Sequence, residues 1–540
     1  STYGGQDEVT RLGDRTALVI GSGPIRIGQG IEFDYCCVRA ALALRNAGYG
    51  TIMINNNPET VSTDFDVSDR LYFEPVTLED VMNIVARERP LGVLVQFGGQ
   101  TAINLAGPLA REGVPILGTQ ATGINLAEDR KEFDSLLARL RIPRPEGGTA
   151  SSMEEGVAAA RHLGYPVLVR PSYVIAGRAM EIVYDEEQLI TYLESAIRVT
   201  DEHPVLIDRY IKGREAEVDA VCDGSETLVC GIMEHIEQAG IHSGDSIAAY
   251  PPVSLTSRQR DLMVEYTSVI AASLGCKGLI NVQFVLDGSS VLVIEANPRA
   301  SRTVPFMSKS TGLPIVDVAV GASLGGTLRE MGYCPGLHPA PRHHSIKAPV
   351  FSFGKLRGVE TSLGPEMKST GEVMGISHSY LDAMSKALSA AGFDLNRKGS
   401  VLMSIADRDK PDATGLATGF ASLGYGIIAT DHTAEWLSGM GIPVQRLDKA
   451  FAPGGSGLER LGMEGVSMAI VTASHGKDPS TWGFSLRRAL SEYGIPTVTA
   501  VSTGYALLAA AKASRERQPG AVAGPVPLNE YLDFRGNRAS

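Results

Sequence analysis

The stretch from Asn281 to Arg299 constrains the fold more than any other part of the sequence. It reads NVQFVLDGSSVLVIEANPR, and Asp287-Gly288 is a β-hairpin turn signal between two apolar runs. We take residues 288–290 as the loop, so that Asp287 is opposite Val291. The apolar residues of both runs then share one face, as expected for strands packed on a core: Val282, Phe284, Leu286, Leu292, Ile294 and Ala296. The sequence therefore predicts a half-buried β-hairpin.

The other face of this predicted hairpin is polar. The same register puts Gln283 opposite Glu295, with Asn297 just beyond. A loop longer by one residue would place Glu295 in the core, which is costly for a carboxylate. One carboxylate and two amide oxygens are hard ligands of the kind that Mg²⁺ uses when phosphate and water complete its shell. Arg299 and Arg302 follow and could neutralise a transferring phosphoryl group. A plain polar face with a salt bridge does not explain these two arginines, so we favour a metal–phosphate site.

Strands and helices alternate simply at both ends of the chain. Near the N-terminus, apolar runs at 17–20, 51–54, 92–97 and 114–117 surround a helical stretch near 31–47. This pattern predicts a parallel α/β domain over residues 1–145. At the other end, residues 397–540 predict a small doubly wound parallel sheet, with a loose tail after Pro519.

The middle of the chain has a different pattern. Residues 146–345 contain strands in hairpin-like pairs, such as 167–170 with 179–183, and this favours an α+β domain. A connector rich in Pro and Gly is expected over 346–396. The predicted fold class is therefore α/β overall, with an α+β domain between two parallel α/β domains.

Composition excludes several classes of protein. The chain has 540 residues, enough for roughly three or four domains, and a net charge of −12 that argues against a nucleic-acid scaffold. No apolar run is long enough to span a membrane, and the start resembles no signal peptide. The six cysteines include no C-x-x-C pair, so we expect reduced, buried cysteines in a cytosolic protein. Because the chain does not begin with Met, it could be a segment of a longer one.

Three further stretches could contact a ligand. The glycine turn at 21–30 follows a strand and opens a helix, but Arg26 and the Asn55–Asn57 run depart from a dinucleotide fingerprint, so a tight turn and phosphate contact both stay open. The loop from Arg170 to Met180 could close over a triphosphate or be an exposed hairpin loop. Residues 234–246 could line a site, although their two histidines lack metal-ligand spacing and are better explained as satisfied side chains.

Taken together, these motifs resemble the C-terminal half of the large subunit of carbamoyl-phosphate synthetase. The resemblance covers essentially the whole chain. It is carried by Gly28–Cys37, Asn57–Asp64, Arg70–Pro75, Gly98–Thr101, the Arg170 loop, Ile236–Asp245, the 281–299 hairpin and Gly364–Met367. It implies a pre-ATP-grasp domain, an ATP-grasp domain and a C-terminal regulatory domain similar to methylglyoxal synthase.

The resemblance also implies a function. The expected reaction is ATP-dependent phosphorylation of carbamate to carbamoyl phosphate, in cytoplasmic pyrimidine and arginine biosynthesis. The implied cofactors are ATP, two divalent ions (Mg²⁺ or Mn²⁺) and K⁺. The implied partners are the N-terminal synthetase half, a glutaminase small subunit and a nucleotide effector, in a hetero-oligomer without nucleic acid or membrane. The alternatives are another ATP-grasp carboxylate ligase related to biotin carboxylase, and a catalytically inactive nucleotide-binding regulator.

Site residues follow from the resemblance position by position. The catalytic group would be Glu295, Arg299 and Arg302, and the metal ligands would be Gln283, Glu295 and Asn297. The implied ATP contacts are Arg130, Arg170, Arg209 (where the family often has His), Ile211, Glu215, Gly240, Ile241, His242, Ser243, Gln283 and Glu295.

The regulatory residues depart from the family pattern in two places. The implied effector site is Lys410, Thr430, Thr433, Lys449 and Thr472, with Val471 in place of an Asn. Glu237, Asp245 and Thr499 match ornithine-binding positions, but Ala348 replaces the remaining carboxylate. Ornithine activation is therefore not expected.

Overall fold

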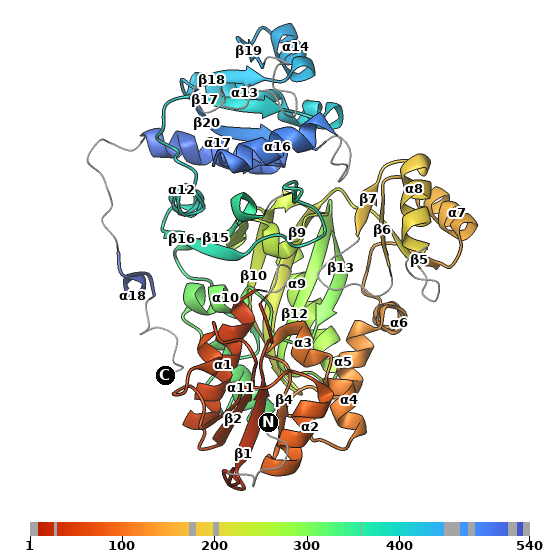
Figure 1. Cartoon of the computed structure of the whole chain (residues 1–540), viewed down its shortest axis with the longest axis vertical. Coiled ribbons are helices and arrows are strands. Elements are labelled where there is room, and N and C mark those ends of the chain that lie inside the picture. The colour runs from red at the N-terminus through yellow and green to blue at the C-terminus, as the bar shows by residue number, and fades with distance from the viewer. Residues whose placement is uncertain are drawn as a thin grey trace.

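The computed structural model describes residues 9–25, 30–171, 180–197, 205–356, 358–447, 465–473, 481–516 and 526–532. Arg26, Gly28, Lys449, most of the 170–180 loop and most of the C-terminal tail lie outside these residues. In the view of Figure 1, the N-terminal α/β unit is at the bottom, a large sheet in the middle, and the C-terminal α/β unit at the top. A smaller sheet projects to one side of the large one.

The N-terminal unit is a parallel sheet in the order β3-β2-β1-β4. Its strands are β1 (Thr16–Ile20), β2 (Gly50–Ile54), β3 (Arg70–Tyr72) and β4 (Gly92–Leu94). β1 is buried throughout, which explains its continuous apolar run. The helix expected near 31–47 is α1 (Glu32–Asn46). The run at 114–117 contributes only a single bridge, between Val93 and Ile116.

The large sheet runs in the order β13-β12-β9-β10-β11-β15-β16, and β14 (Gly336–Leu337) pairs with β10. Its main strands are β9 (Arg214–Asp223), β10 (Thr227–Gln238), β11 (Ala248–Tyr250), β12 (Lys277–Asp287), β13 (Ser290–Asn297), β15 (His344–Val350) and β16 (Gly371–Ser377). The helix α9 (Ser257–Ser273) packs against β9, β10, β12 and β13, and α11 (Ile315–Ser323) contacts β9, β12 and α1. The expected connector thus supplies two strands, β15 and β16; the predicted boundaries at 145, 345 and 396 stay predictions.

A small subdomain stands beside the large sheet and is made of an antiparallel sheet with two helices. The sheet order is β5-β8-β6-β7, with β5 (Gly147–Ala150), β6 (Val167–Pro171), β7 (Glu181–Val183) and β8 (Val205–Arg209). The helices α7 (Met153–Leu163) and α8 (Glu186–Ile197) contact each other beside this sheet. The predicted pairing of residues 167–170 with the strand around 181–183 is confirmed, since Val167 is opposite Val183.

The hairpin from β12 to β13 differs from the predicted register at its tip. Asp287 pairs with Ser290, so the loop is one residue shorter than expected. A β-bulge at Ile294 then restores the predicted partnership of Gln283 with Glu295. Leu292 and Ile294 were wrongly placed in the core: the buried residues of this strand are Val291, Val293 and Ala296. The predicted hairpin and polar pair are confirmed, but the register between them is corrected by the bulge.

The C-terminal unit is a parallel sheet in the order β19-β18-β17-β20-β21. Its strands are β17 (Ser400–Ser404), β18 (Gly426–Ala429), β19 (Gln445–Arg446), β20 (Val466–Val471) and β21 (Thr497–Val498). Its helices are α13 (Lys410–Ser422), α14 (Asp431–Gly439), α16 (Trp482–Glu492) and α17 (Val501–Glu516). The helix α12 (Tyr380–Ala390) contacts β15 and β16 on one side and α17 on the other. The predicted alternation of strands and helices is confirmed in each of these elements.

Two expectations need correction. The described part of the tail is not loose: α18 (Leu528–Tyr531) places the Tyr531 ring 5.3 Å from that of His378 and 5.8 Å from that of His343, measured between ring centroids. Cys334 is exposed, whereas the other five cysteines are buried, and all six are free. Among the described residues, no helix is both long enough and apolar enough to cross a membrane.

Candidate active site

A cavity of about 720 Å³ lies between the small subdomain and the large sheet. Residues from β6 and β8 line one side, residues from β12 and β13 line the other, and the 239–244 segment also contributes. Every residue predicted from the sequence to contact nucleotide, metal or phosphoryl group lines this one cavity: Arg130, Arg170, Arg209, Ile211, Glu215, Gly240, Ile241, His242, Ser243, Gln283, Glu295, Asn297, Arg299 and Arg302. The fold thus gathers residues that are up to 172 positions apart (302 − 130) in the sequence.

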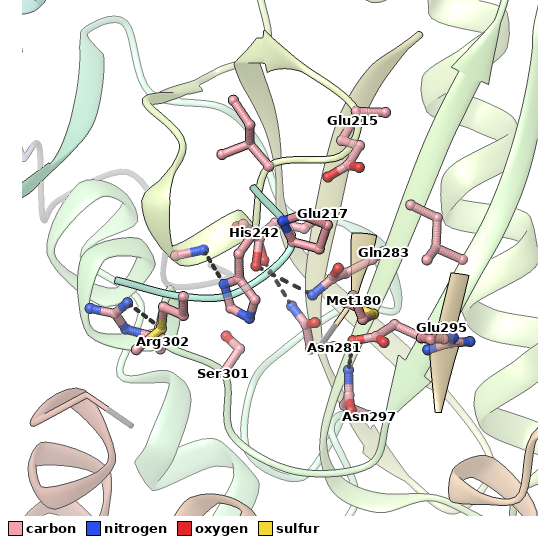
Figure 2. Close-up of a pocket in the computed structure, with 18 of the residues that line it drawn as sticks. Met180, Glu215, Glu217, His242, Asn281, Gln283, Glu295, Asn297, Ser301 and Arg302 are labelled. Atoms are coloured by element: carbon pink, nitrogen blue, oxygen red, sulfur yellow. Dashed lines mark hydrogen bonds between the residues drawn. The ribbon is translucent and has the colours of Figure 1, made fainter. Parts of the chain in front are cut away.

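The acidic centre of the cavity is Glu295 with its amide neighbours. Asn297 Nδ2 donates to Glu295 Oε1 at 2.9 Å, and Gln283 is the cross-strand partner of Glu295. Figure 2 shows the three side chains grouped at the hairpin, with Arg302 toward the other side of the view. Among the described residues, no cluster of three or more His, Cys, Asp or Glu could hold a metal ion. One carboxylate with two amides therefore fits a divalent ion that is shared with phosphate oxygens, and does not fit an all-protein metal site.

Arg299 lies next to this group. Its Nη2 donates to Asn297 Oδ1 at 3.2 Å and its Nη1 to the Ala300 carbonyl at 3.0 Å. Burial lowers the pKa of the Arg299 guanidinium, although the nearby charge of Glu295 acts in the opposite direction. The side chain is half-buried, and its buried Nε has no hydrogen-bond partner among the described residues, which favours binding of an anion in the cavity.

Arg302 is anchored from two distant parts of the chain. Its Nη2 and Nε donate to the two carboxylate oxygens of Glu32 at 2.9 and 3.2 Å, and its Nη1 donates to Ser369 Oγ at 2.9 Å. Burial acts to lower the pKa of Arg302, but the Glu32 carboxylate outweighs it and raises the pKa. Arg302 thus stays charged at the edge of the cavity. The sequence did not indicate Glu32, because an acid in the first turn of a helix is ordinary.

Two arginines surround one carboxylate of the small subdomain: Asp208 on β8 and Arg170 on β6 belong to it, whereas Arg130 begins α6 (Arg130–Leu140) outside it. Arg130 Nη2 and Arg170 Nη2 lie 3.5 and 3.7 Å from the two Asp208 oxygens, respectively. Arg130 Nη1 also donates to the Ile294 carbonyl at 3.1 Å, which lies at the bulge. Arg130 therefore connects Asp208 of the small subdomain to the hairpin that bears Glu295. Asp208 was missed, because only the fold places it between two arginines.

His235 forms a buried cluster of charged side chains with two glutamates that line the cavity. His235 Nε2 is 3.3 Å from Glu217 Oε1, and His235 Nδ1 is 3.6 Å from Glu215 Oε2. Burial alone would lower the pKa of His235, but the two carboxylates raise it to about 9. His235 is therefore a charged histidine between two carboxylates, in keeping with the structural role expected from the sequence, although only its Nε2 is hydrogen-bonded. His242 differs: it lines the cavity, burial lowers its pKa, and its Nδ1 accepts the Gly244 N–H at 3.0 Å.

The predicted effector residues lie in the C-terminal unit, away from this cavity. Thr430 and Thr472 directly follow β18 and β20, Thr433 lies in the first turn of α14, and Lys410 begins α13. Thr433 Oγ1 and Thr472 Oγ1 accept the backbone N–H groups of Ile405 and Ala406 at 3.0 and 2.8 Å. The carboxyl edge of a parallel sheet is where such folds bind ligands.

The three residues at ornithine-binding positions are engaged within the protein. Glu237 accepts the Ile247 N–H at 2.7 Å, Asp245 accepts the Lys368 and Ser369 N–H groups at 2.8 and 2.9 Å, and Thr499 Oγ1 accepts the Leu363 N–H at 3.3 Å. Ala348 is buried beside Lys347. No carboxylate of this set therefore faces a cationic ligand without an internal partner.

Comparisons with known proteins agree with this arrangement. Residues 13–126 match the carbamoyl phosphate synthase preATP-grasp domain, residues 129–331 the ATP-binding domain of the carbamoyl-phosphate synthase L chain, and residues 412–499 the MGS-like domain. The predicted fold class is thereby confirmed: a pre-ATP-grasp domain, an ATP-grasp domain and a C-terminal MGS-like domain.

Several solved structures share the fold of the first two domains. The biotin carboxylase domain of Hydrogenobacter thermophilus 2-oxoglutarate carboxylase, solved with MgADP, ADP and bicarbonate, is 19% identical with a TM-score of 0.55, over 69% of this chain and 89% of that chain. Campylobacter jejuni biotin carboxylase is 15% identical with a TM-score of 0.53, over 69% and 91%. Thermotoga maritima N5-carboxyaminoimidazole ribonucleotide synthetase is 14% identical with a TM-score of 0.51, over 70% and 97%.

The domain set and the site together define the class of protein. The chain is an ATP-grasp enzyme of the ligase type, similar to the carbamoyl-phosphate synthase large chain and to biotin carboxylases. The low identity to the solved structures limits that likeness to the fold. The two models from carbamoyl-phosphate synthase cover the residues that line the cavity except Lys347, Pro365 and Met367.

Proposed function

We propose that this chain phosphorylates carbamate with ATP to give carbamoyl phosphate, as the second synthetase half of a carbamoyl-phosphate synthase. The observation that carries the proposal is the group of Gln283, Glu295, Asn297, Arg299 and Arg302 in one cavity. A carbamate oxygen is already a nucleophile, so the reaction needs positioning and charge neutralisation more than a strong base. This group supplies those two functions.

Each residue of the group has a distinct part in the proposal. Gln283, Glu295 and Asn297 would hold the divalent ion, Mg²⁺ or Mn²⁺, which neutralises phosphate charge when it is bound. Arg299 and Arg302 would face the transferring phosphoryl group, and Arg302 is kept charged by Glu32. Arg130 and Arg170 would contact the nucleotide and help the small subdomain to exclude water from the labile carbamate.

The reverse reaction gives a direct test. Carbamoyl phosphate with MgADP should yield ATP on this chain, and Glu295→Ala should abolish that activity, by at least about a thousandfold, because loss of the carboxylate removes the charged metal ligand. Asp287→Ala, which removes an exposed acid from the tip of the same hairpin, is the matched control and should leave the rate unchanged. ATP formation is followed by a coupled spectrophotometric assay; a normal rate in Glu295→Ala would refute the assignment.

The cellular context is part of the same proposal. The N-terminal synthetase half and a glutaminase small subunit would deliver carbamate in the cytoplasm for pyrimidine and arginine biosynthesis, and K⁺ would serve as a further ion. A nucleotide effector would bind at the carboxyl edge of the C-terminal sheet, near Lys410, Thr430, Thr433, Lys449 and Thr472. The match to an MGS-like domain over residues 412–499 supports an effector site in this unit.

A second candidate is a carboxylate ligase of the biotin carboxylase type. The likeness of fold to two biotin carboxylases favours it. The MGS-like domain and the Gly364–Met367 motif, whose Met367 contacts Arg302, favour carbamoyl phosphate chemistry instead. ADP release that depends on bicarbonate and free biotin, without ATP formation from carbamoyl phosphate, would select the second candidate.

A further inference from the structure

Lys347 is a fully buried lysine that lines the candidate active site. Its exposed fraction is 0%, and it lies on β15, where it is the cross-strand partner of Ala248. Its Nζ donates to the Ser243 carbonyl at 2.9 Å. A lysine is among the residues least often buried, because its ammonium loses most of its hydration in the interior. Its position inside an apolar strand therefore needs an explanation.

The ammonium of Lys347 lacks a close countercharge in the protein. No carboxylate within the described ranges lies within 4.0 Å of it, although Glu217 and Glu372 act on it from farther away. Glu217 is already paired with His235. A buried charge without an adjacent partner is unfavourable by several kcal/mol, so such a group is retained where a ligand supplies the opposite charge. Glu372 is half-buried and more than 4.0 Å away, so an anion bound in the cavity next to Lys347 would supply the close countercharge.

The placement of Lys347 indicates which anion. Lys347 Nζ donates to the Ser243 carbonyl, which belongs to the turn at residues 243–245. Arg302 lies close to the same turn, because a Cβ added to Gly244 would lie 2.4 Å from Arg302 Nη1. Lys347 and Arg302 thus flank one turn at the same end of the cavity. Arg130 and Arg170 lie instead around Asp208 of the small subdomain. Lys347 therefore lies at the Arg302 end of the cavity, where the proposed function puts the transferring phosphoryl group and its acceptor.

We propose that Lys347 is a substrate-binding residue that contacts the anionic acceptor, a carboxylate-type substrate and the acyl phosphate formed from it. This inference rests on the proposed function and adds to it a third cation beside Arg299 and Arg302. Lys347 makes no covalent bond in this proposal; its ammonium supplies charge and a hydrogen bond to an acceptor oxygen. The bond to the Ser243 carbonyl holds the ammonium in place.

The first experiment separates the two substrates. With the full chain, KM values for carbamoyl phosphate and for MgADP are measured in the ATP-forming direction for wild type and for Lys347→Met, which keeps the length and apolar stem of the side chain. We expect KM for carbamoyl phosphate to rise at least tenfold and KM for MgADP to change less than twofold. Unchanged values, or an equal rise of both, would overturn the proposal, because a purely structural role would not distinguish the two substrates.

A matched control is available in Lys368. This lysine is also buried, with an exposed fraction of 8%, and its Nζ donates to the Glu360 carbonyl at 2.9 Å, but it does not line the cavity. Lys368→Met should lower the thermal midpoint about as much as Lys347→Met while leaving KM for carbamoyl phosphate within twofold of wild type. A tenfold rise in this control would mean that loss of any buried lysine disturbs the site, and would overturn the specific role of Lys347.

A second measurement does not depend on turnover. The thermal midpoint of each ADP-loaded protein is measured without and with inorganic phosphate. The phosphate concentration is 20 times its dissociation constant for wild type, and each variant without phosphate is its own reference. Phosphate should raise the midpoint of wild type and Lys368→Met, and should fail to raise that of Lys347→Met or Lys347→Gln. If wild type makes no ATP, the proposed function is wrong, but the phosphate test still shows whether Lys347 binds an anion. If phosphate stabilises wild type, Lys368→Met, Lys347→Met and Lys347→Gln equally, the anion site is refuted.

Discussion

At the scale of single residues, His235 is the clearest case of a charge set by the fold. It is buried between Glu215 and Glu217, which raise its pKa to about 9. The value is above that of an unfolded histidine, about 6.5, so the charged group stabilises the fold fully below about pH 6.5. This contribution, of order 3 kcal/mol at about 1.4 kcal/mol per pH unit, is lost as the pH rises through 9.

We therefore expect the stability advantage of wild type over His235→Gln to shrink between pH 6.5 and pH 9.5. Because a chain with several domains does not unfold in one step, the thermal midpoint of the first transition is the appropriate measure. Arg329→Ala, which removes an exposed partner of Glu226, should show a difference that does not change with pH over this range. A constant difference for His235→Gln would mean that the imidazole is neutral in the folded protein.

The residues of the site were predictable from sequence only where the local pattern of polar and apolar residues indicated them. Gln283 and Glu295 were found because polar residues alternate with core residues along two strands. Glu32 and Lys347 were not found, since each is surrounded by sequence that has an ordinary explanation: a helix start for Glu32 and an apolar strand for Lys347. What makes them part of the site is contact with residues more than 100 positions away.

At the scale of elements, the β-bulge at Ile294 sets the register that places Glu295 opposite Gln283 in the hairpin. Strict alternation along β13 would require the loop length assumed from the sequence, whereas the structure shortens the loop and adds an unpaired residue. The alternation of apolar residues cannot reveal such a bulge, because moving it along the strand changes only which of two neighbouring apolar residues is buried. The bulge leaves the Ile294 carbonyl available to Arg130.

Deletion of Ile294 should therefore weaken nucleotide binding and leave the metal group in place. Without the bulge, Glu295 follows Val293 directly and still faces the cavity opposite Gln283, but the acceptor for Arg130 is lost. A hydrogen bond to a charged group is worth about 1.5 kcal/mol, so KM for MgADP should rise roughly tenfold. Ile294→Ala retains the carbonyl and should change KM much less; an unchanged KM in the deletion would show that the bulge has no part in binding.

At the scale of the whole molecule, the C-terminal unit is attached through a buried ion pair. Arg487 of α16 donates to both oxygens of Glu360 at 2.8 and 2.6 Å, and the exposed fraction of each side chain is below a tenth. On the outside of the same unit, Lys212 Nζ pairs with Asp412 at 2.8 Å, and the Arg408 guanidinium lies 4.4 Å from the centre of the Tyr184 ring. These contacts join the C-terminal unit to both the large sheet and the small subdomain.

Arg487→Met should loosen this attachment. It leaves Glu360 buried without its partner, which typically costs about 3–5 kcal/mol. We expect limited proteolysis to cut between the large sheet and the C-terminal unit at least about tenfold faster than in wild type, as followed by mass spectrometry. Arg446→Ala, which breaks exposed pairs with Asp431 and Glu435 inside the C-terminal unit, should cut at the wild-type rate. Equal rates for Arg487→Met and wild type would show that the ion pair does not hold the unit.

The order of the units was predictable from the sequence, but their assembly was not. Simple strand–helix alternation identified both parallel sheets, and hairpin spacing identified the antiparallel region between them. The connector was expected to separate two units, yet β15 and β16 extend the large sheet and α12 packs between the sheet and α17. Short strands with few flanking signals cannot be distinguished from loops until their pairing partners are known.

The segment from Glu360 to Ser369 contacts both the C-terminal unit and the cavity. Glu360 accepts hydrogen bonds from the guanidinium of Arg487 in the C-terminal unit, and nine positions later (369 − 360) Ser369 accepts one from Arg302 at the candidate active site. Between them, the backbone N–H of Lys368 is fixed by Asp245. A segment of this length can extend only a little. A rotation of the C-terminal unit that displaced Glu360 would therefore also displace the Ser369 hydroxyl, which accepts a hydrogen bond from Arg302. A displacement of the C-terminal unit would therefore reach the Ser369 hydroxyl through nine residues of chain.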